Sequence, residues 1–315
     1  MTRKDESSEY YIKRLDENRL KDIETLHKAI YGKKPKKNYF LKKYNTTYAG
    51  VKYIGYIAYN TKNIPIAFFG VIPCFIQYGN ELILCAQAVD AMTLSHFRYK
   101  GIFVKLVRAT IDLCKSEGIC LVFGFPNQNS YHGLVHTLKW SVTERMELFT
   151  IPVNAFPLEK LLRDFRWTEW IYKKYAGWIL KKYSIAEPGL PSSVIAEGYG
   201  GVYRNEEYLK YKSNDKQVIQ IGNSKAWIKI RNGLIIGDLS GEAQHFHLLM
   251  NTIKKIAKLL GISRIFFHAS PGTRLHTLFE KWYKAEASFP VIFLELEASV
   301  PLEKIKFTFA DIDIF

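Results

Sequence analysis

One stretch of the sequence, residues 90–106, constrains the fold more than any other. It reads as the end of an apolar strand, a polar turn with the pattern Arg98-x-x-Gly101, and a helix that begins at once. The first backbone N–H groups of a helix lack intrahelical partners, and the helix dipole adds positive potential there. A glycine lets the backbone approach a phosphate closely because it has no Cβ. The stretch therefore predicts an anion pocket suited to a diphosphate-bearing cofactor, although an ordinary strand–helix turn has the same pattern.

The residues that follow give this turn a context. The expected helix covers roughly residues 102–116, and Gly118 is a natural stop for it. Residues 119–125 then form a nearly continuous apolar run, which is typical of a buried strand. A polar loop at residues 126–130 opens a second helix. The order strand, turn, helix, strand, loop, helix predicts an α/β chain.

This order resembles the cofactor-binding core of the GNAT superfamily of acyl-CoA N-acyltransferases. Four further patterns resemble a bacterial subset that is often associated with surface-polysaccharide genes: Tyr-Gly-Lys-Lys-Pro from Tyr31, Gly70-Val-Ile-Pro73, Asp90-x-Met92-Thr93 and Gly124-Phe-Pro-Asn127. The resemblance implies a site for acetyl-CoA or coenzyme A. It assigns to this site Met92, Leu94, Arg98, Lys100, Gly101, Ile102, Phe103, Asn127 and Ser130.

One residue of the turn departs from the superfamily pattern. Phe103 stands where that pattern has a small residue. Backbone N–H donors survive any side chain, so binding of the diphosphate is still expected. The ring must then turn away from the pocket into the core.

Acyl transfer from a thioester needs a neutral amine, a polarised carbonyl and a proton for the departing thiolate. The resemblance implies that the pantetheine arm lies along residues 88–94 like an added strand. Asp90 is the only ionisable side chain on that strand and is the candidate base, with a purely structural acceptor as the alternative. The superfamily usually supplies the acid from a tyrosine near position 135, but this chain has Val135 there. The candidates nearby are Tyr131 and His132, with His136 as a further alternative.

The second half of the chain repeats landmarks of the first at a constant offset of 143 residues. The matching pairs are Gly118 and Gly261, Asn127 and Ser270, and Trp140 and Tyr283. Opposite the Arg-x-x-Gly turn, this half has Gly241-Glu-Ala-Gln244, which places a carboxylate where a diphosphate would bind. We therefore expect the first half to bind the cofactor and the second to help build the substrate cleft. Tandem arrangements with one degenerate copy resemble the Fem-type aminoacyltransferases and related GNAT proteins.

These patterns predict an α/β (α+β) fold with two GNAT-like domains, each a mixed, mostly antiparallel sheet flanked by helices. The N-terminal domain, with the acyl-CoA site, is expected at residues 1–155, and the degenerate domain at residues 196–315. A helical linker is expected at residues 156–195.

The expected linker is rich in aromatic residues and lysine pairs. Trp167, Trp170 and Trp178 lie off its apolar stripe, a feature of helices at a membrane surface. We favour a helix that bridges the two domains, because Glu159, Asp164 and Glu169 interrupt its basic face.

The formal net charge of +15 indicates anionic partners or a solvated basic face. Six lysines crowd residues 33–43 among aromatic residues, a pattern that suits nucleic acid, coenzyme A phosphates or an anionic membrane. Because no helix-turn-helix, zinc-finger or RNP pattern accompanies them, we do not expect nucleic acid. The four cysteines lack metal-ligand spacing and suit a reduced cytoplasm, so we expect a cytoplasmic protein without metal. The sequence shows neither an apolar signal segment nor a run near the roughly 20 residues of a membrane span.

The sequence thus predicts an acyl-CoA-dependent N-acyltransferase, with acetyl as the expected group. Its expected substrate is an amine such as an amino sugar of polysaccharide biosynthesis, acylated by direct transfer from the thioester. Two alternatives stay open. One is a Fem-like transferase that uses aminoacyl-tRNA, and the other is a GNAT relic that binds a ligand without catalysis.

Overall fold

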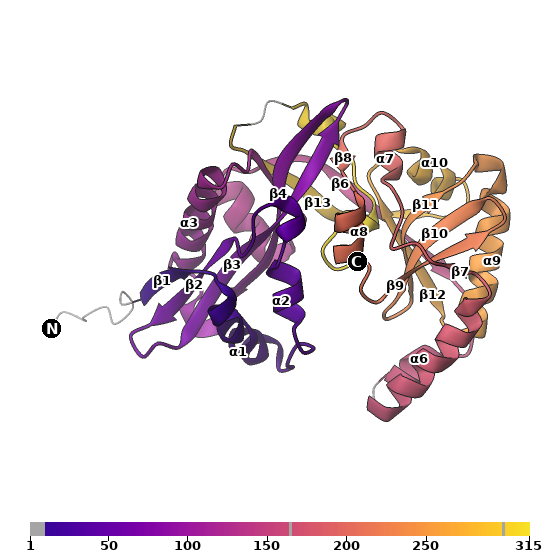
Figure 1. Ribbon diagram of the computed structural model, residues 1–315, viewed down its shortest axis with the longest axis horizontal. Coiled ribbons are helices and arrows are strands. Elements are labelled where there is room, and N and C mark those ends of the chain that lie inside the picture. Colours follow the sequence, from indigo (N-terminus) through magenta and orange to yellow (C-terminus); the bar gives the residue numbers. More distant parts are fainter. Residues whose placement is uncertain (1–9, 164–165, 298–299) are drawn as a thin grey trace. The chain divides into compact units, whose positions relative to one another are not determined.

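The computed structural model describes residues 10–163, 166–297 and 300–315, and residues 163, 166 and 167 by their backbone alone. The chain divides into two units (Figure 1). Unit 1 takes its described residues from Met1–Ile76, Leu82–Thr143 and Val291–Val300. Unit 2 takes them from Gln77–Glu81, Glu144–Pro290 and Pro301–Phe315. Each unit therefore contains a segment from the other half of the sequence.

The first half of the sequence alternates strands with helices. Its elements are β1 (Tyr10–Arg14), α1 (Leu20–Tyr31), α2 (Tyr39–Tyr44), β2 (Gly55–Asn60), β3 (Pro65–Tyr78), β4 (Glu81–Thr93), α3 (Ile102–Ser116), β5 (Leu121–Gly124), α4 (Gln128–Tyr131), a π-helical turn (His132–Thr137) and β6 (Ser141–Pro152).

The sheet of unit 1 has the strand order β1-β2-β3-β4-β5-β13. Strands β1, β2 and β3 pair antiparallel, β4 and β5 pair parallel, and the last strand pairs antiparallel with β5. β3 is apolar almost throughout because it is buried nearly along its whole length. α3 packs on the sheet through residues spaced three and four apart, among them Val107, Ile111 and Cys114 (Figure 1).

The second half of the sequence repeats this alternation. Its elements are α5 (Leu158–Arg163), α6 (Arg166–Lys181), β7 (Ser184–Ile185), α7 (Ser193–Ala196), β8 (Gly201–Val202), α8 (Glu206–Lys212), β9 (Lys216–Ile221), β10 (Ser224–Ile230), β11 (Leu234–Ser240), α9 (Phe246–Leu259), β12 (Arg264–Ala269), α10 (Arg274–Glu280) and β13 (Ala285–Glu295). The sheet of unit 2 has the order β7-β9-β10-β11-β12-β6.

Both sheets share one topology. In unit 2, β11 and β12 form the parallel pair, as β4 and β5 do in unit 1. α3 ends at Ser116 and α9 at Leu259, 143 residues later, and β5 begins at Leu121 and β12 at Arg264, again 143 residues later. The offset seen in the sequence therefore corresponds to equivalent elements.

The last strand of each sheet is exchanged. β13 closes the sheet of unit 1 by pairing Phe293 with Phe123 of β5. β6 closes the sheet of unit 2 by pairing Phe149 with Phe267 of β12. Each unit therefore needs a strand from the other half of the sequence to complete its core.

The expected linker helix belongs to unit 2. α6 buries Tyr172, Ala176 and Leu180 in the same core as residues of α9. The Tyr172 hydroxyl donates to the Leu260 carbonyl at 2.9 Å, and the Tyr175 hydroxyl donates to the Leu259 carbonyl at 2.7 Å. The apolar stripe of α6 thus packs against α9 and the sheet of unit 2. Phe165 and the Trp167 side chain lie outside the described residues.

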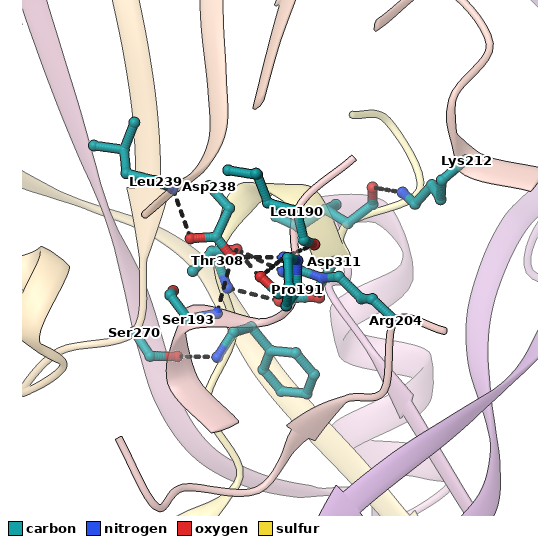
Figure 2. A network of polar contacts seen from close by, with 12 residues as sticks. Leu190, Pro191, Ser193, Arg204, Lys212, Asp238, Leu239, Ser270, Thr308 and Asp311 are labelled. Atoms are coloured by element: carbon teal, nitrogen blue, oxygen red, sulfur yellow. Dashed lines mark hydrogen bonds and ion pairs between the residues drawn. The ribbon is translucent and has the colours of Figure 1, made fainter. Parts of the chain in front are cut away.

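Unit 2 also holds a fully buried ionic network around Arg204 (Figure 2). Its guanidinium donates to Asp238 at 2.6 Å, to Asp311 at 2.8 Å and to the Thr308 hydroxyl at 2.9 Å. The side chains of the arginine and both aspartates have no exposed surface. The network fixes the segment 308–311 against β11.

A buried histidine makes unit 2 sensitive to acid. His268 of β12 lies between Phe289 and Phe309, with ring centroids 5.1 and 4.2 Å away, and its Nδ1 is 2.9 Å from the Ser288 hydroxyl. Burial lowers the pKa of His268 from 6.5 to about 4. The unfolded chain therefore takes up a proton below pH 6.5, whereas the folded chain does so only near pH 4. Stability must fall as pH falls through this window.

We expect the free energy of unfolding to drop by about 2 kcal/mol between pH 7 and pH 5 from this group alone. His268→Gln should remove that part of the pH dependence, measured by urea unfolding at both values. His247→Gln changes an exposed histidine of α9 and should keep the pH dependence of the parent protein. If His268→Gln and the parent protein lose the same free energy on acidification, the assignment is wrong.

Candidate functional site

The turn before α3 has the geometry of an anion pocket. Gly101 is the N-cap of α3 with φ +74°, and Tyr99 has φ +62° and is fully exposed. No described side chain caps the helix, and no described atom lies within 4 Å of the position that a Gly101 Cβ would take. The first N–H groups of α3, from Ile102 onward, are therefore free of a capping side chain. Such donors can hold a diphosphate.

The two basic residues of the turn stay near it. Arg98 Nε donates to the Thr93 carbonyl at 3.3 Å, so this side chain folds back onto the end of β4. The Lys100 ammonium lies 5.5 Å from the centre of the Phe97 ring. Both side chains are exposed, and they add positive charge beside the helix N-terminus.

Phe103 points into the core. Its ring is half-buried and lies edge-on to Phe69 with centroids 5.9 Å apart. A Cβ on Gly133 would approach the Phe103 ring to 2.7 Å, so the missing side chain at position 133 makes room for the ring. The departure from the superfamily pattern therefore leaves the backbone of the turn uncovered.

The pairing between β4 and β5 ends beside this turn. Their parallel register ends at Ala88 opposite Gly124, whereas β4 runs on to Thr93. Residues 89–93 of β4 thus extend beyond the end of β5. Of the residues assigned to the cofactor there, Met92 is buried, and the backbone N–H of Leu94 donates to the Ile66 carbonyl at 2.9 Å.

Asp90 lies on this extension with an unusual backbone. Its φ of +43° is left-handed, which is costly for a residue with a Cβ and is found where function or packing demands it. The Tyr44 hydroxyl donates to Asp90 Oδ2 at 2.7 Å, and the Lys43 ammonium lies 2.9 Å from the same oxygen. Both of these contacts are made to Oδ2. The carboxylate is therefore held by one oxygen, while the other is not engaged by this pair.

The neighbouring patterns explain how Asp90 is held. Tyr44 packs edge-on against Phe68 with centroids 5.5 Å apart, and a Cβ on Gly70 would lie 2.9 Å from its hydroxyl. The missing side chain of Gly70 therefore leaves room for the Tyr44 ring. Lys43 is only 8% exposed, so it is a partner of Asp90 and does not belong to a solvated basic patch. The other five lysines of residues 33–43 are exposed.

Tyr31 ends α1 in the same region. Burial and then the negative charge of Asp90 raise the pKa of Tyr31, while the charges of Lys43 and Arg98 lower it. The Tyr31 side chain is nevertheless 58% exposed at the end of α1. The phenol keeps its proton at neutral pH and can act as a hydrogen-bond donor.

The predicted polar loop folds as a helix cap. Asn127 Oδ1 accepts from the backbone N–H groups of Asn129 and Ser130 at 2.9 and 3.2 Å, so it begins α4. The Ser130 hydroxyl donates back to the Asn127 carbonyl at 3.4 Å. These contacts occupy Asn127 Oδ1 with its own helix.

Tyr131 and His132 sit at the start of the π-helical turn. The ring of His136 lies 5.8 Å from Tyr131 and 5.1 Å from His132, so the three rings form one cluster. Single π-helical turns are frequent at functional sites. No contact in the described part of the chain joins this cluster to Asp90.

The four cysteines are buried or half-buried. Cys74, Cys85 and Cys114 are buried, and burial raises the pKa of Cys114 to about 12. Cys120 is half-buried, with Sγ 3.4 Å from the Gly118 carbonyl. Across the residues that the structure describes, no group of three or more potential ligands could hold a metal ion.

The equivalent turn in unit 2 is closed by its own side chains. α9 begins at Phe246, after a 3-10 turn at Ala243–His245. The Arg274 guanidinium donates to the Gly241 carbonyl at 2.9 Å, and the Arg274 backbone N–H donates to the Glu197 carboxylate at 2.7 Å. A second diphosphate would meet these groups and the exposed Glu242.

Comparison with solved structures gives the fold a name. A GCN5-related N-acetyltransferase from Kribbella flavida is 11% identical, with a TM-score of 0.60 over 92% of this chain and 71% of that chain. A probable N-acyltransferase from Enterococcus faecalis V583 is 10% identical, with a TM-score of 0.60 over 92% and 73% of the two chains. This is the GNAT fold.

A third solved structure is the N-myristoyltransferase of Saccharomyces cerevisiae with bound myristoyl-CoA. It is 10% identical, with a TM-score of 0.57 over 93% of this chain and 84% of that chain. No protein-family model matches the sequence, and no curated protein does either. The predicted mixed α/β fold of the GNAT type is confirmed, and at these identities the likeness concerns the fold.

Three groups near Asp90 were missed by the sequence analysis: Tyr31, Lys43 and Tyr44. Tyr31 opens one of the patterns that supported the resemblance, and Lys43 was counted within a basic cluster. The alternation of lysine and aromatic residues does not indicate which lysine is buried in an ion pair and which are exposed. The exposed turn and the strained Asp90, by contrast, fall within the stretch that the sequence singled out.

Proposed function

We propose that the chain is an acyl-CoA-dependent N-acyltransferase that transfers an acyl group, with acetyl as the expected one, directly to an amine. The observation that carries this proposal is the uncapped N-terminus of α3 beside the extension of β4. An uncapped helix end suits a diphosphate, and free backbone groups of a strand suit an amide-containing arm. The GNAT fold of solved N-acetyltransferases and of an enzyme with bound myristoyl-CoA supports the same donor class.

The residues of the turn would hold the donor. Backbone N–H groups from Ile102 onward would bind the diphosphate, and Arg98 and Lys100 would add charge. Gly101 keeps the approach open, and Phe103 leaves it open by packing against Gly133. Met92, Leu94, Asn127 and Ser130 would line the site through their backbone and their packing. Acyl-CoA supplies an activated thioester.

Asp90 would act as the base. Its Oδ1 would take the proton of the attacking amine, while Tyr44 and Lys43 hold Oδ2 and fix the carboxylate. The departing sulfur needs a proton in return, and Tyr31, whose pKa is raised by burial and by the charge of Asp90, is a candidate donor. Tyr131 and His132 remain candidates for the same role from the neighbouring helix.

The acceptor would be a small amine, such as an amino sugar of surface-polysaccharide biosynthesis. Unit 2 would not bind a second donor, since Glu242 places a carboxylate at the equivalent turn and Arg274 donates to the Gly241 carbonyl there. Binding of acetyl-CoA by calorimetry, followed by thiol release with a panel of amines, tests the proposal. Salt-sensitive binding of tRNA without binding of acetyl-CoA would support the Fem-like alternative instead. Binding without turnover on any amine would support a relic.

Asp90→Asn should lower kcat by about 100-fold or more while the Kd for acetyl-CoA stays within about twofold. The amide cannot take the proton, whereas the diphosphate site is unchanged. Thiol release and calorimetry on the same preparation separate the two effects. Thermal unfolding should accompany them, since Lys43 loses part of its partner.

Asp22→Asn is the matched control. Its carboxylate also accepts from a tyrosine hydroxyl, that of Tyr59 at 2.6 Å, on another element of unit 1. We expect this variant to keep the parent kcat. Parent-like turnover in Asp90→Asn would show that Asp90 is only a structural acceptor.

A further inference from the structure

The outer face of α6 differs from an ordinary solvated helix face. The helix is anchored to unit 2 through its inner face, so its outward side chains are presented by a fixed support. Trp170 and Trp178 are 58% and 74% exposed, and Ile171 is 46% exposed. Exposed apolar side chains that lie next to one another and are rimmed by charged residues mark interaction surfaces.

The exposed residues form one alternating row. Trp170, Lys174, Trp178 and Lys182 are spaced four apart, so they follow one another along the same side of the helix and its end. The Lys174 ammonium lies 4.0 Å from the centre of the Trp170 ring. We call these four residues and Ile171 the α6 row. Indole rings and lysine ammonium groups thus alternate along it.

The acidic residues of this segment do not interrupt the row. Glu159 is buried and accepts from the Asn232 backbone N–H at 3.2 Å. Glu169 pairs with Lys173 at 2.5 Å. Asp164 lies outside the described residues. The objection that acidic residues break the basic face therefore does not hold for the two that are described.

We propose that the α6 row docks on an anionic phospholipid surface. Indole rings favour the boundary between headgroups and acyl chains, with the ring apolar and the N–H in contact with water. Lysines beside them attract anionic headgroups, and the chain as a whole carries a formal net charge of +15. The helix would lie in the plane of the surface. Within the described residues, no helix has the length and apolar character needed to cross a bilayer.

Co-sedimentation with lipid vesicles tests this surface. The protein should bind vesicles of phosphatidylcholine with roughly 30% phosphatidylglycerol, bind pure phosphatidylcholine weakly, and dissociate at about 0.5 M salt. The double variant Trp170→Ala/Trp178→Ala should bind the anionic vesicles roughly tenfold more weakly or worse. Lys174→Glu/Lys182→Glu should weaken binding to a similar extent. Circular dichroism shows whether each variant is folded. The two variants change different residues, so if one of them misfolds the other still tests the surface.

Trp282→Ala is the matched control, because Trp282 is also 58% exposed on unit 2 but lies outside the row. It should bind as the parent protein does, and it should keep the blue shift of tryptophan emission on vesicle addition that the Trp170/Trp178 variant loses. Parent-like vesicle binding by the Trp170/Trp178 variant would overturn the proposal. The proposal would also be overturned if the parent protein formed dimers without lipid in analytical ultracentrifugation and this variant did not. The row would then bind a second copy of the chain. The outcome does not depend on the acyltransferase proposal.

Discussion

Gly101→Trp is expected to abolish detectable binding of acetyl-CoA, with a rise in Kd of about 100-fold or more. Gly101 has φ +74°, and the place of its Cβ is open, so the new side chain would project into the space in front of the α3 N-terminus. That space is where the diphosphate must approach the N–H groups. Isothermal titration calorimetry with acetyl-CoA measures the loss directly.

The matched control is Gly118→Trp at the other end of the same helix. Gly118 also has φ +74° and an open Cβ position, so both variants carry the same backbone strain. Only the first places a ring at the anion pocket. If both variants lose binding equally, the effect comes from strain in α3. If Gly101→Trp binds as tightly as the parent protein, the donor lies elsewhere.

The order of elements could be predicted from the sequence, but the pairing of the last strands could not. Glycine stops and apolar runs located α3, β5, α9 and β12, since these signals are local. The apolar run of β13 would fit the centre of any sheet, because alternation and burial do not name a partner strand. Its pairing with β5 is therefore set by tertiary contacts and not by the local sequence.

The same limit applies within the candidate site. Asp90 was found because it is the single ionisable side chain on an apolar strand. Its partners were not found, because Tyr44 lies 46 residues away in sequence and its contact depends on the packing of α2 against β3. The π-helical turn at His132–Thr137 has no marker in composition that separates it from an ordinary helix.

The helix expected as a linker shows what an amphipathic stripe leaves open. A stripe predicts that one face is covered but does not say by what. In the structure the cover is α9 and the sheet of unit 2, which leaves the opposite face with its tryptophans exposed. The buried arginine of the same unit had no sequence signal, since a lone Arg204 in a polar loop is usually solvated.

Arg204→Met is expected to lower the free energy of unfolding by about 3–5 kcal/mol. The substitution keeps an apolar stem but leaves Asp238 and Asp311 buried without their cation (Figure 2). Burial raises the pKa of Asp311, and Arg204 opposes that shift. Without Arg204 the folded-state pKa of Asp311 rises further, so the loss of stability should grow as pH rises and shrink toward pH 5. Urea unfolding of variant and parent at pH 5 and pH 7 measures both effects.

Arg14→Met gives the matched control. Its ion pair with Glu117 has the same kind of contact at 2.7 Å, but the two side chains are 48% and 28% exposed. Water solvates the freed carboxylate there, so the cost should stay under about 1 kcal/mol. Adding Asp238→Asn and Asp311→Asn to Arg204→Met should restore part of the stability, because the unpaired charges are then gone. Equal costs for the two arginine variants would mean that solvent reaches the Arg204 network, and its burial would then not explain how residues 308–311 are held in place.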